Sequence, residues 1–242
     1  MEKMIEISGL KKSFGSLEVL SDIDLILEKG DNLAILGRSG IGKSVLTKCI
    51  VGLIEPDEGT IFVLGQEIGK MEYDDLNELR TRIGYLFQGG ALYDSMSVKE
   101  NLIFPMRKKK KLISKGELQD RVEEVLENVG LSEAIDKMPS ELSGGMRKRI
   151  ALARTLIKRP EIIFYDEPTT GLDPVTSGEI SDLIVSVSEK YDTSSIIVTH
   201  DMKCARITAS YLKLLEDGIF YAEGTYDEMA SNEDLKVSSF FH

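Results

Sequence analysis

A glycine-rich segment near the N-terminus has the composition of a loop that binds phosphate. Residues 37–44 read Gly-Arg-Ser-Gly-Ile-Gly-Lys-Ser and match the pattern G-x-x-x-x-G-K-[ST] at every fixed position. Glycines let the backbone wrap closely around phosphate oxygens, and the start of a helix supplies partial positive charge. Lys43 can reach the outer phosphates, and the Ser44 hydroxyl suits Mg²⁺. Because an apolar strand-like segment precedes the loop and a helical one follows it, a phosphate site fits better than an ordinary turn.

Two adjacent carboxylates end another apolar segment. Residues 162–165 read Ile-Ile-Phe-Tyr, and Asp166 and Glu167 follow them directly. Ligands bind at the carboxyl ends of parallel strands in α/β sheets, so we expect this pair at the edge that carries the phosphate loop. Asp166 would then hold Mg²⁺, and Glu167 would orient or deprotonate an attacking water.

Two more polar residues follow apolar strand-like segments. Gln88 comes after 83–87, and its amide could reach Mg²⁺ or the attacking water. His200 comes after 195–198 and Thr199, where its ring could touch a terminal phosphate. An ordinary loop glutamine and a structural histidine are the alternatives.

A second segment also has the composition of an anion-binding helix start. Ser143, Gly144 and Gly145 stand before a helical pattern, and a helix N-terminus attracts anions. The alternative is a simple N-cap in which Ser143 only satisfies the backbone. One chain with one phosphate loop and a second phosphate-seeking surface suggests that the second surface serves a partner's ligand. That arrangement predicts a two-fold dimer with two shared sites.

Periodicity predicts the elements that must position these residues. Apolar runs and alternation predict strands at 4–10, 19–27, 32–36, 60–64, 83–87, 162–165 and 195–198, and a hairpin of 211–215 with 219–222. Helices are predicted from Gly37 to Leu53, at 74–82, at 144–157 and from Pro174 onward. Helical spacing also dominates 101–140, where Ser114 and Glu117 have capping-box spacing. We therefore expect one α/β domain over 1–242, with a helical subdomain inserted near residues 90–155.

Composition narrows the function classes. The chain has 242 residues, and 30 Lys+Arg against 41 Asp+Glu give a net charge of −11, which argues against a nucleic-acid partner. No run approaches the roughly 18 consecutive apolar residues of a membrane span, and no signal peptide is visible. Two cysteines, Cys49 and Cys204, are too few for a disulfide framework, so we expect a cytoplasmic protein. Local positive charge gathers at 107–111 and 147–149; the first cluster is either a solvated face or a contact for anionic lipid headgroups.

The order of these motifs resembles that of an ATP-binding-cassette (ABC) ATPase subunit, and the resemblance covers nearly the whole chain. It takes in Phe14, the Walker A loop at 37–44, Gln88 of the Q-loop, the signature at 142–146, Walker B at 162–166 with Glu167, the D-loop at 171–174 and His200 of the H-loop. The resemblance implies an α/β fold of the P-loop NTPase class and ABC type, in which a RecA-like core carries an antiparallel β subdomain and the helical insertion. Two departures stand out: Met146 replaces the usual glutamine of the signature, and Phe14 replaces a frequent tyrosine.

The resemblance also implies ATP and Mg²⁺ as cofactors, and a role for each matching residue. Glu167 would be the catalytic base, with Lys43, Gln88 and His200 also in the catalytic set, and Ser44, Gln88 and Asp166 would hold the metal. Phe14 would stack on adenine, and Asp173 would communicate across the dimer. The expected nucleotide-binding residues are Phe14, Gly37, Arg38, Ser39, Gly40, Ile41, Gly42, Lys43, Ser44, Val45, Ser143, Gly144, Gly145 and Asp173.

Two segments narrow the resemblance to a branch of the family. Residues 87–98, with their Gly-Gly-Ala-Leu-Tyr-Asp-Ser run, and residues 141–149 resemble the Mla/Mce-type phospholipid-transport ATPases. That branch implies a homodimer on the cytoplasmic face of the inner membrane, with an integral-membrane permease and an Mce-domain lipid-binding protein as partners. The alternatives are the ATPase of another importer, for example for an osmoprotectant, and an ABC ATPase outside transport. The short separation of Lys43 and Asp166 leaves no room for the long coiled coil of chromosome and repair members.

Overall fold

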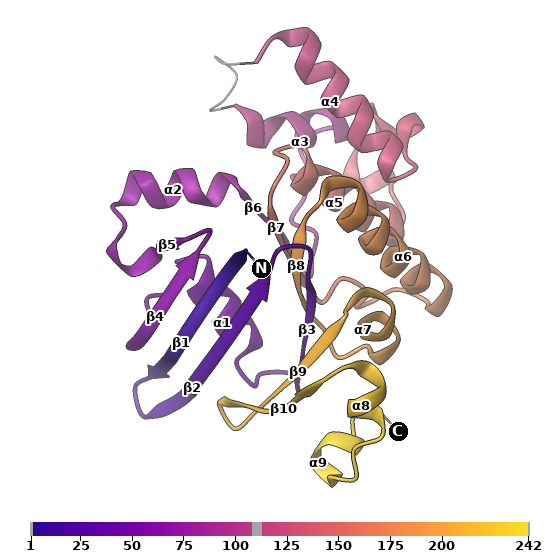
Figure 1. The fold of residues 1–242 in the computed structure, drawn as a ribbon. Helices are drawn as coiled ribbons and strands as arrows, with labels where there is room; N and C mark the ends of the chain where they lie inside the picture. Colours follow the sequence, from indigo (N-terminus) through magenta and orange to yellow (C-terminus); the bar gives the residue numbers. More distant parts are fainter. Residues whose placement is uncertain (1, 108–112, 242) are drawn as a thin grey trace.

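The computed structural model describes residues 2–107 and 113–241, which form one ten-stranded sheet flanked by helices (Figure 1). The strand order is β5-β4-β1-β2-β10-β9-β3-β8-β7-β6. The strands are β1 (Lys3–Phe14), β2 (Leu17–Glu28), β3 (Asn32–Leu36), β4 (Glu58–Val63), β5 (Gln66–Glu67), β6 (Ile83–Leu86), β7 (Ile162–Asp166), β8 (Ser194–Val198), β9 (Tyr211–Glu216) and β10 (Ile219–Gly224).

One part of the sheet is antiparallel. β1 pairs with both β2 and β4, and β4 pairs with β5. Alternate side chains of β1, such as Ile5 and Ile7, are buried, because one face of this layer packs on the core and the other faces water. The strands predicted at 4–10, 19–27 and 60–64 are confirmed, and the first two extend further than their apolar patterns indicated.

The other part of the sheet is parallel. β6 pairs with β7, β7 with β8, β8 with β3, and β3 with β9, all in parallel. The apolar residues of β3, β7 and β8 are buried, as continuous apolar runs predict for strands covered on both faces. Asp166 pairs with Val198 and Leu86 with Tyr165, so the residues that follow β6, β7 and β8 leave the sheet at one edge.

The helices are α1 (Lys43–Ile50), α2 (Tyr73–Thr81), α3 (Val98–Ile103), α4 (Lys115–Asn128), α5 (Gly144–Leu156), α6 (Pro174–Tyr191), α7 (Met202–Thr208), α8 (Tyr226–Ala230) and α9 (Leu235–Ser238). The prediction that a helix opens at Gly37 is wrong, because Gly37, Gly40 and Gly42 have φ of 149°, 81° and 116° and form an open loop before α1. No helix in residues 2–107 and 113–241 is long and apolar enough to cross a membrane.

The segment between β6 and β7 is helical, as predicted. Its helices α3, α4 and α5 lie toward one end of the molecule, opposite α8 and α9 (Figure 1). The apolar face predicted for α4, with Val122 and Leu126, packs in the same buried cluster as residues of α5 and α6. Ser114 caps α4, because its Oγ accepts a hydrogen bond from the Glu117 amide at 3.1 Å. Most of the basic segment at 107–111 lies outside the described residues; Arg107 places its guanidinium 4.5 Å from the Phe104 ring centre.

The C-terminal third completes the sheet. β9 and β10 form the predicted antiparallel hairpin. β10 also pairs in parallel with β2 at Ile219 and Asp22, a contact that the sequence pattern did not indicate. α8 and α9 then cover a third buried cluster, against which Phe240 and Phe241 pack.

Candidate functional site

One cavity brings together side chains from distant parts of the chain. It has a volume of about 560 Å³ and lies at the edge where β3, β6, β7 and β8 end. Its lining is Phe14, Val19, Gly37, Arg38, Ser39, Gly40, Gly42, Lys43, Ser44, Val45, Gln88, Asp166, Glu167, Val198, His200 and Phe240. The residues expected to bind phosphate, to hold Mg²⁺ and to act on water thus share one hollow. Of residues 37–45, Ile41 alone does not line it, since its side chain packs against a buried cluster.

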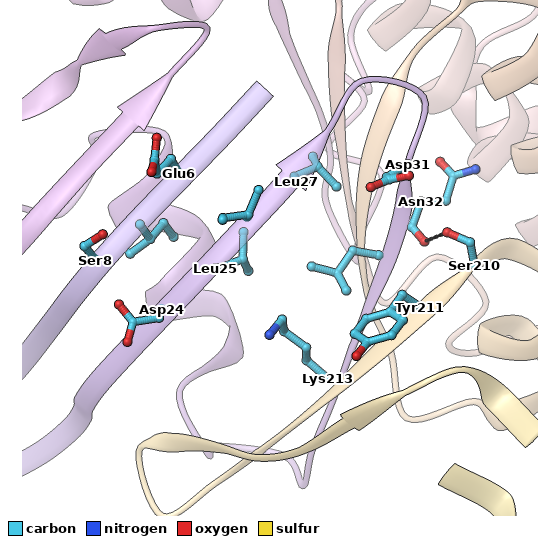
Figure 2. Close-up of a pocket in the computed structure, with 13 residues that line it drawn as sticks. Glu6, Ser8, Asp24, Leu25, Leu27, Asp31, Asn32, Ser210, Tyr211 and Lys213 are labelled. Carbon is cyan, nitrogen blue, oxygen red and sulfur yellow. Dashed lines mark hydrogen bonds between the residues drawn. The ribbon is translucent and has the colours of Figure 1, made fainter. Parts of the chain in front are cut away.

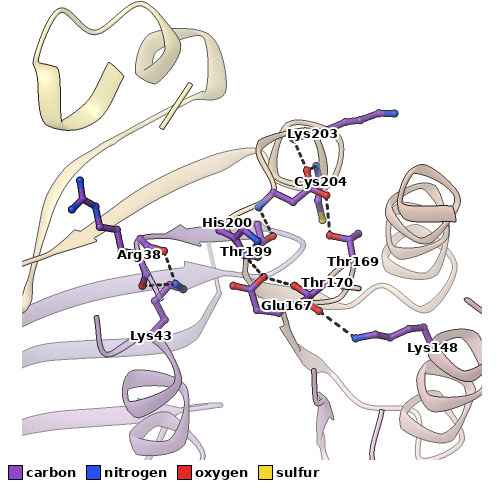
Figure 3. Close-up of polar contacts among 12 residues, drawn as sticks. Arg38, Lys43, Lys148, Glu167, Thr169, Thr170, Thr199, His200, Lys203 and Cys204 are labelled. Atoms are coloured by element: carbon purple, nitrogen blue, oxygen red, sulfur yellow. Dashed lines mark hydrogen bonds and ion pairs between the residues drawn. The ribbon is translucent and has the colours of Figure 1, made fainter. Parts of the chain in front are cut away.

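In the phosphate loop, two of the three glycines with positive φ are also required because a side chain there would clash with neighbouring atoms. A Cβ at Gly37 would lie 2.7 Å from the Leu215 carbonyl oxygen, and one at Gly42 would lie 2.8 Å from Val19 Cγ1. Inside this loop the Lys43 ammonium donates to the carbonyls of Gly37 at 2.5 Å and Arg38 at 3.0 Å (Figure 3). Lys43 is only 6% exposed, and burial lowers its pKa. Its charge is therefore held in place by groups that phosphate oxygens can replace.

Asp166 ends β7 at the floor of the cavity. Burial raises the pKa of its carboxyl group, and the neighbouring Glu167 charge raises it further. The Tyr85 hydroxyl opposes this by donating to Asp166 Oδ2 at 3.4 Å, and it also lies 3.0 Å from Thr47 Oγ1. A carboxylate whose charge is this poorly compensated suits a cation. Because Ser44, Gln88 and Asp166 line the same hollow with hydroxyl, amide and carboxylate oxygens, the donor set fits Mg²⁺.

Two contacts hold the Glu167 side chain, although its own backbone is strained. Its φ is 51°, in the left-handed region that costs a non-glycine residue about 1–3 kcal/mol. Its Oε2 accepts from Thr170 Oγ1 at 3.0 Å and lies 2.8 Å from His200 Nδ1 (Figure 3). A carboxylate oxygen accepts, so the Nδ1 atom carries the proton in this contact. The Glu167 side chain is 14% exposed and the His200 side chain is 63% exposed, so the imidazole covers the carboxylate from the solvent side.

Aromatic side chains also line the cavity. Phe14 ends β1 with 49% of its surface exposed and with Lys12 Nζ 5.4 Å from its ring centre. The exposed part of the ring is available to stack on a planar ligand. Phe240, from the turn after α9, lines the same cavity. The sequence offered only the adjacent Phe240 and Phe241 as a signal for this second aromatic.

The second phosphate-seeking segment does not reach the cavity of its own chain. Ser143 caps α5, because its Oγ accepts a hydrogen bond from the Met146 amide at 3.2 Å. Gly144 and Gly145 form the first turn of α5, and a Cβ at Gly145 would lie 2.5 Å from Thr176 Cγ2. None of these three residues lines the cavity.

Asp173 likewise lies away from the cavity. It caps α6, where its Oδ1 accepts from the amides of Val175 and Thr176 at 3.0 Å each. A further hydrogen bond from Thr176 Oγ1 to Oδ2, at 2.5 Å, is the main cause that lowers the pKa of Asp173. Asp173 is therefore fixed as a charged cap beside the start of α5.

Two residues that support the site, Tyr85 and Lys148, were not predicted from the sequence. Tyr85 is hidden in an apolar strand, and nothing in its neighbours signals that its hydroxyl faces Asp166. Lys148 belongs to the basic cluster 147–149, and nothing in that cluster indicates that the Lys148 side chain is buried. It is 7% exposed and donates to the backbone carbonyls of Gln88 and Glu167.

A different hollow, of about 430 Å³, lies between β1–β2 and β3–β9 (Figure 2). Three of its charged side chains have partners: Asp24 Oδ1 accepts from the Gly9 amide at 2.9 Å, Glu6 pairs with Lys3, and Lys213 pairs with Glu223. Its lining contains neither the glycine-rich loop nor the imidazole of the first cavity. Chemistry on a phosphoanhydride belongs to the first cavity.

Comparison with known proteins agrees with this geometry. The family model described as "ABC transporter" matches residues 20–170. Over 238 residues the chain is 43% identical to the "Probable ribonucleotide transport ATP-binding protein mkl" of Mycobacterium leprae, covering 98% of this chain and 68% of that one. Over 239 residues it is 39% identical to the "Intermembrane phospholipid transport system ATP-binding protein MlaF" of Haemophilus influenzae, covering 99% and 90%.

A solved structure shows the same fold. The dimeric ATP-binding cassette MJ0796, in a post-hydrolysis state with ADP and Pi, superposes with a TM-score of 0.83 at 30% identity, covering 92% of this chain and 99% of that one. The expected α/β P-loop fold of ABC type is therefore confirmed. With a matching family model across more than half of its length and a nucleotide-binding cassette as its fold, the chain belongs to the ABC transporter family.

Proposed function

We propose that two copies of this chain bind ATP with Mg²⁺, hydrolyse it, and thereby power a membrane permease that moves phospholipid or another hydrophobic molecule. The observation that carries the hydrolytic part is the shared cavity, because Lys43, the pair Asp166 and Glu167, and His200 converge there from three separate segments of the chain. Each brings a group that phosphoryl transfer to water requires: a cation, a metal ligand, a base and a contact for the terminal phosphate.

The residues that line the cavity have different roles in ATP binding and hydrolysis. The loop amides and the Lys43 ammonium bind the β- and γ-phosphates, with the lysine exchanging its two loop carbonyls for phosphate oxygens. Glu167, oriented by Thr170, takes a proton from the water that attacks the γ-phosphorus in line, and His200 contacts the γ-phosphate. Ser44, Gln88 and Asp166 would hold Mg²⁺, which neutralises charge on the phosphate oxygens when bound. Phe14 stacks on adenine.

A second copy completes each site. The residues at the start of α5 do not line the cavity of their own chain, yet a helix N-terminus capped by an exposed serine is suited to an anion. In a two-fold pair, Ser143, Gly144 and Gly145 would contact the γ-phosphate held by the other copy, with Asp173 beside them. The dimeric state of the MJ0796 cassette supports this arrangement.

The transport part rests on likeness to MlaF and on the segment after Gln88. That segment carries glycines and then Tyr93, whose ring is 43% exposed and lies 5.9 Å from the Arg154 guanidinium. A small and partly apolar surface of this kind lets a permease helix approach closely. We propose a phospholipid transporter with an Mce-domain partner, at the cytoplasmic face of the inner membrane. The mkl relative supports a second candidate cargo, because its name refers to ribonucleotide transport.

The hydrolytic part is tested with Glu167→Gln, and with Glu133→Gln as the control at an exposed position. We expect Glu167→Gln to bind ATP and form a stable dimer while phosphate release falls by about 100-fold or more, because the amide cannot accept the proton. Glu133→Gln should behave as the parent does. Phosphate release and size-exclusion mass report the two properties, and ordinary turnover in Glu167→Gln would refute the assignment of the base.

The transport part needs the membrane complex. A tagged Glu167→Gln chain, purified from membranes with ATP and Mg²⁺, should carry a multispanning protein, and lipid extraction of that complex should yield bound phospholipid. A chain that does not associate with membranes contradicts the transporter proposal. A complex that holds ribonucleotide and no lipid favours the second cargo.

A further inference from the structure

Lys148 occupies a place that its sequence neighbourhood does not indicate. It follows the first turn of α5, between the exposed Arg147 and the half-buried Arg149, yet its own side chain is buried. Its ammonium donates to the Gln88 carbonyl and, at 3.2 Å, to the Glu167 carbonyl (Figure 3 shows the second contact). The Lys148 side chain thus connects α5, the helix that begins in the signature segment, to Gln88 in the loop after β6 and to Glu167 directly after β7.

A buried ammonium has to be compensated. Removing a charge from water costs several kcal/mol unless hydrogen bonds or opposite charges replace the lost hydration. Here burial lowers the pKa of Lys148, and the charges of Asp166 and Glu167 oppose that shift. Two backbone carbonyls and the charges of Asp166 and Glu167 thus offset part of the lost hydration. The contact depends on the ammonium, because an apolar chain of equal length would leave the Gln88 carbonyl without this donor and the Glu167 carbonyl with only the Thr170 amide at 3.4 Å.

The two carbonyls belong to residues whose placement matters. Glu167 has the left-handed φ of 51°, and such strain persists only where surrounding contacts hold it. Its amide donates to the Val198 carbonyl at 2.8 Å, and its carbonyl accepts from Lys148 at 3.2 Å and from the Thr170 amide at 3.4 Å. Together these backbone contacts set the direction in which the carboxylate leaves the chain.

α5 also contacts the residues that follow Gln88 in the same loop. Arg154, also on α5, donates to the Ala91 carbonyl at 2.7 Å and the Gly90 carbonyl at 3.2 Å. α5 therefore holds residues 88–91 through two cations, of which only Lys148 also reaches Glu167. Lys148 therefore joins that loop to Glu167.

We propose that Lys148 is a positioning residue for hydrolysis: it fixes the backbone of Glu167 so that the carboxylate faces the attacking water, and it ties that position to the Gln88 loop. The inference rests on the proposed role of Glu167 as the base. It assigns to the signature helix a function within its own chain, separate from any contact with a partner's nucleotide.

The test compares Lys148→Met with Lys137→Met, which removes an exposed lysine in the same helical region. We expect Lys148→Met to lower kcat about 10- to 100-fold, as a displaced catalytic group does, while the Kd for a fluorescent ATP analogue changes less than about threefold. Lys148→Gln keeps an amide donor without a buried charge, so its kcat should lie between those of Lys148→Met and Lys137→Met. It should also fold if Lys148→Met does not. A Kd that weakens in parallel with kcat overturns the proposal.

A double-mutant cycle separates positioning from a general structural effect. If Lys148 acts through Glu167, then Lys148→Met should slow the Glu167→Gln variant by less than about twofold, since the base is already lost. An equal fold loss in both backgrounds overturns the proposal. The proposal is also overturned if Arg154→Gln lowers kcat as much as Lys148→Met does, because Arg154 contacts the loop and not Glu167.

A measurement without turnover keeps the inference distinct from the proposed function. Amide hydrogen exchange at Glu167, Thr169 and Thr170 should be faster in Lys148→Met than in Lys137→Met, because the Glu167 carbonyl has lost its closer donor. Unchanged exchange there overturns the positioning role. Absence of hydrolysis in the parent, with faster exchange in the variant, would instead count against the proposed function.

Discussion

The Tyr85 hydroxyl offers a one-atom test of how the metal-binding carboxylate is supported. Burial raises the pKa of Tyr85 to about 12, so its hydroxyl is a neutral donor at pH 7. It lies 3.0 Å from Thr47 Oγ1 and 3.4 Å from Asp166 Oδ2, while the ring packs 4.3 Å from that of Phe87 and 5.9 Å from that of Phe164. Tyr85→Phe removes the hydroxyl and keeps the ring packing.

The magnitude follows from which contacts are lost. Thr47 keeps its hydrogen bond to the Ser44 carbonyl at 3.2 Å, and the 3.4 Å contact to Asp166 is long and weak. One ordinary hydrogen bond contributes about 0.5–1.5 kcal/mol, so we expect the free energy of unfolding to fall by about 1 kcal/mol. The Asp166 carboxylate also loses an orienting donor. A loss of about 1 kcal/mol in orientation corresponds to a roughly fivefold higher Mg²⁺ concentration for half-maximal ATPase activity.

Urea denaturation and an ATPase titration with Mg²⁺ measure the two effects. Tyr73→Phe is the matched control, because Tyr73 is an exposed residue at the start of α2. A loss of more than about 3 kcal/mol in Tyr85→Phe would show that ring packing had changed, and would refute the hydrogen-bond reasoning. An unchanged or lower Mg²⁺ requirement would show that the hydroxyl does not support Asp166.

Three other substitutions separate packing, nucleotide binding and pH dependence. Gly84→Ala places a Cβ 2.4 Å from Thr155 Cγ2 in the buried interface of β6 and α5, so the free energy of unfolding should fall by about 1–3 kcal/mol in urea titrations. Phe14→Ala should raise the ATP Kd about 5- to 10-fold through lost stacking, with little change in melting temperature because the ring is half exposed. The Arg82 hydrogen bond lowers the pKa of Glu161, so the pair stabilises the fold above the ordinary pKa of 4.5, and that contribution is lost as the pH falls through the lowered value. Glu161→Gln should therefore be less stable than the parent at pH 7, by less than about 1 kcal/mol for so exposed a pair, and the difference should shrink as the pH falls below 4.5.

Each of these expectations has an outcome that contradicts it. Gly69→Ala, which meets no atom within 4 Å, should leave stability unchanged, and an equal loss there would remove the clash as the cause at Gly84. An unaltered ATP Kd in Phe14→Ala would exclude stacking. A stability difference for Glu161→Gln that does not shrink as the pH falls below 4.5 would show that the carboxylate charge is not its source.

Short-range patterns determined much of this protein before any tertiary contact was considered. The phosphate loop, with glycines where φ is positive, is a local backbone requirement that residue spacing reveals directly. The same holds for Asp166 and Glu167 at the end of an apolar strand and for Asp173 as the cap of α6. The edge shared by Gln88, Glu167 and His200 followed because parallel strands present their carboxyl ends together.

The sequence predicted the boundaries of helices and strands, and the pairing of strands, less well. The helix predicted from Gly37 begins at Lys43, because the same glycines that permit the loop also exclude helix there. The parallel contact between β10 and β2 joins residues almost two hundred positions apart, and no local pattern encodes that choice.

Only the tertiary structure decided how the site is supported. Lys148 reads as surface charge in its sequence neighbourhood, and it becomes buried because α5 packs against the ends of β6 and β7. Tyr85 and Phe240 look like ordinary apolar residues, yet one supports Asp166 and the other lines the cavity. The His200 contact with Glu167 depends on the register of β7 against β8. Reactive groups follow from residue type and local spacing, whereas their supporting contacts follow from packing between distant segments, which sequence spacing does not encode.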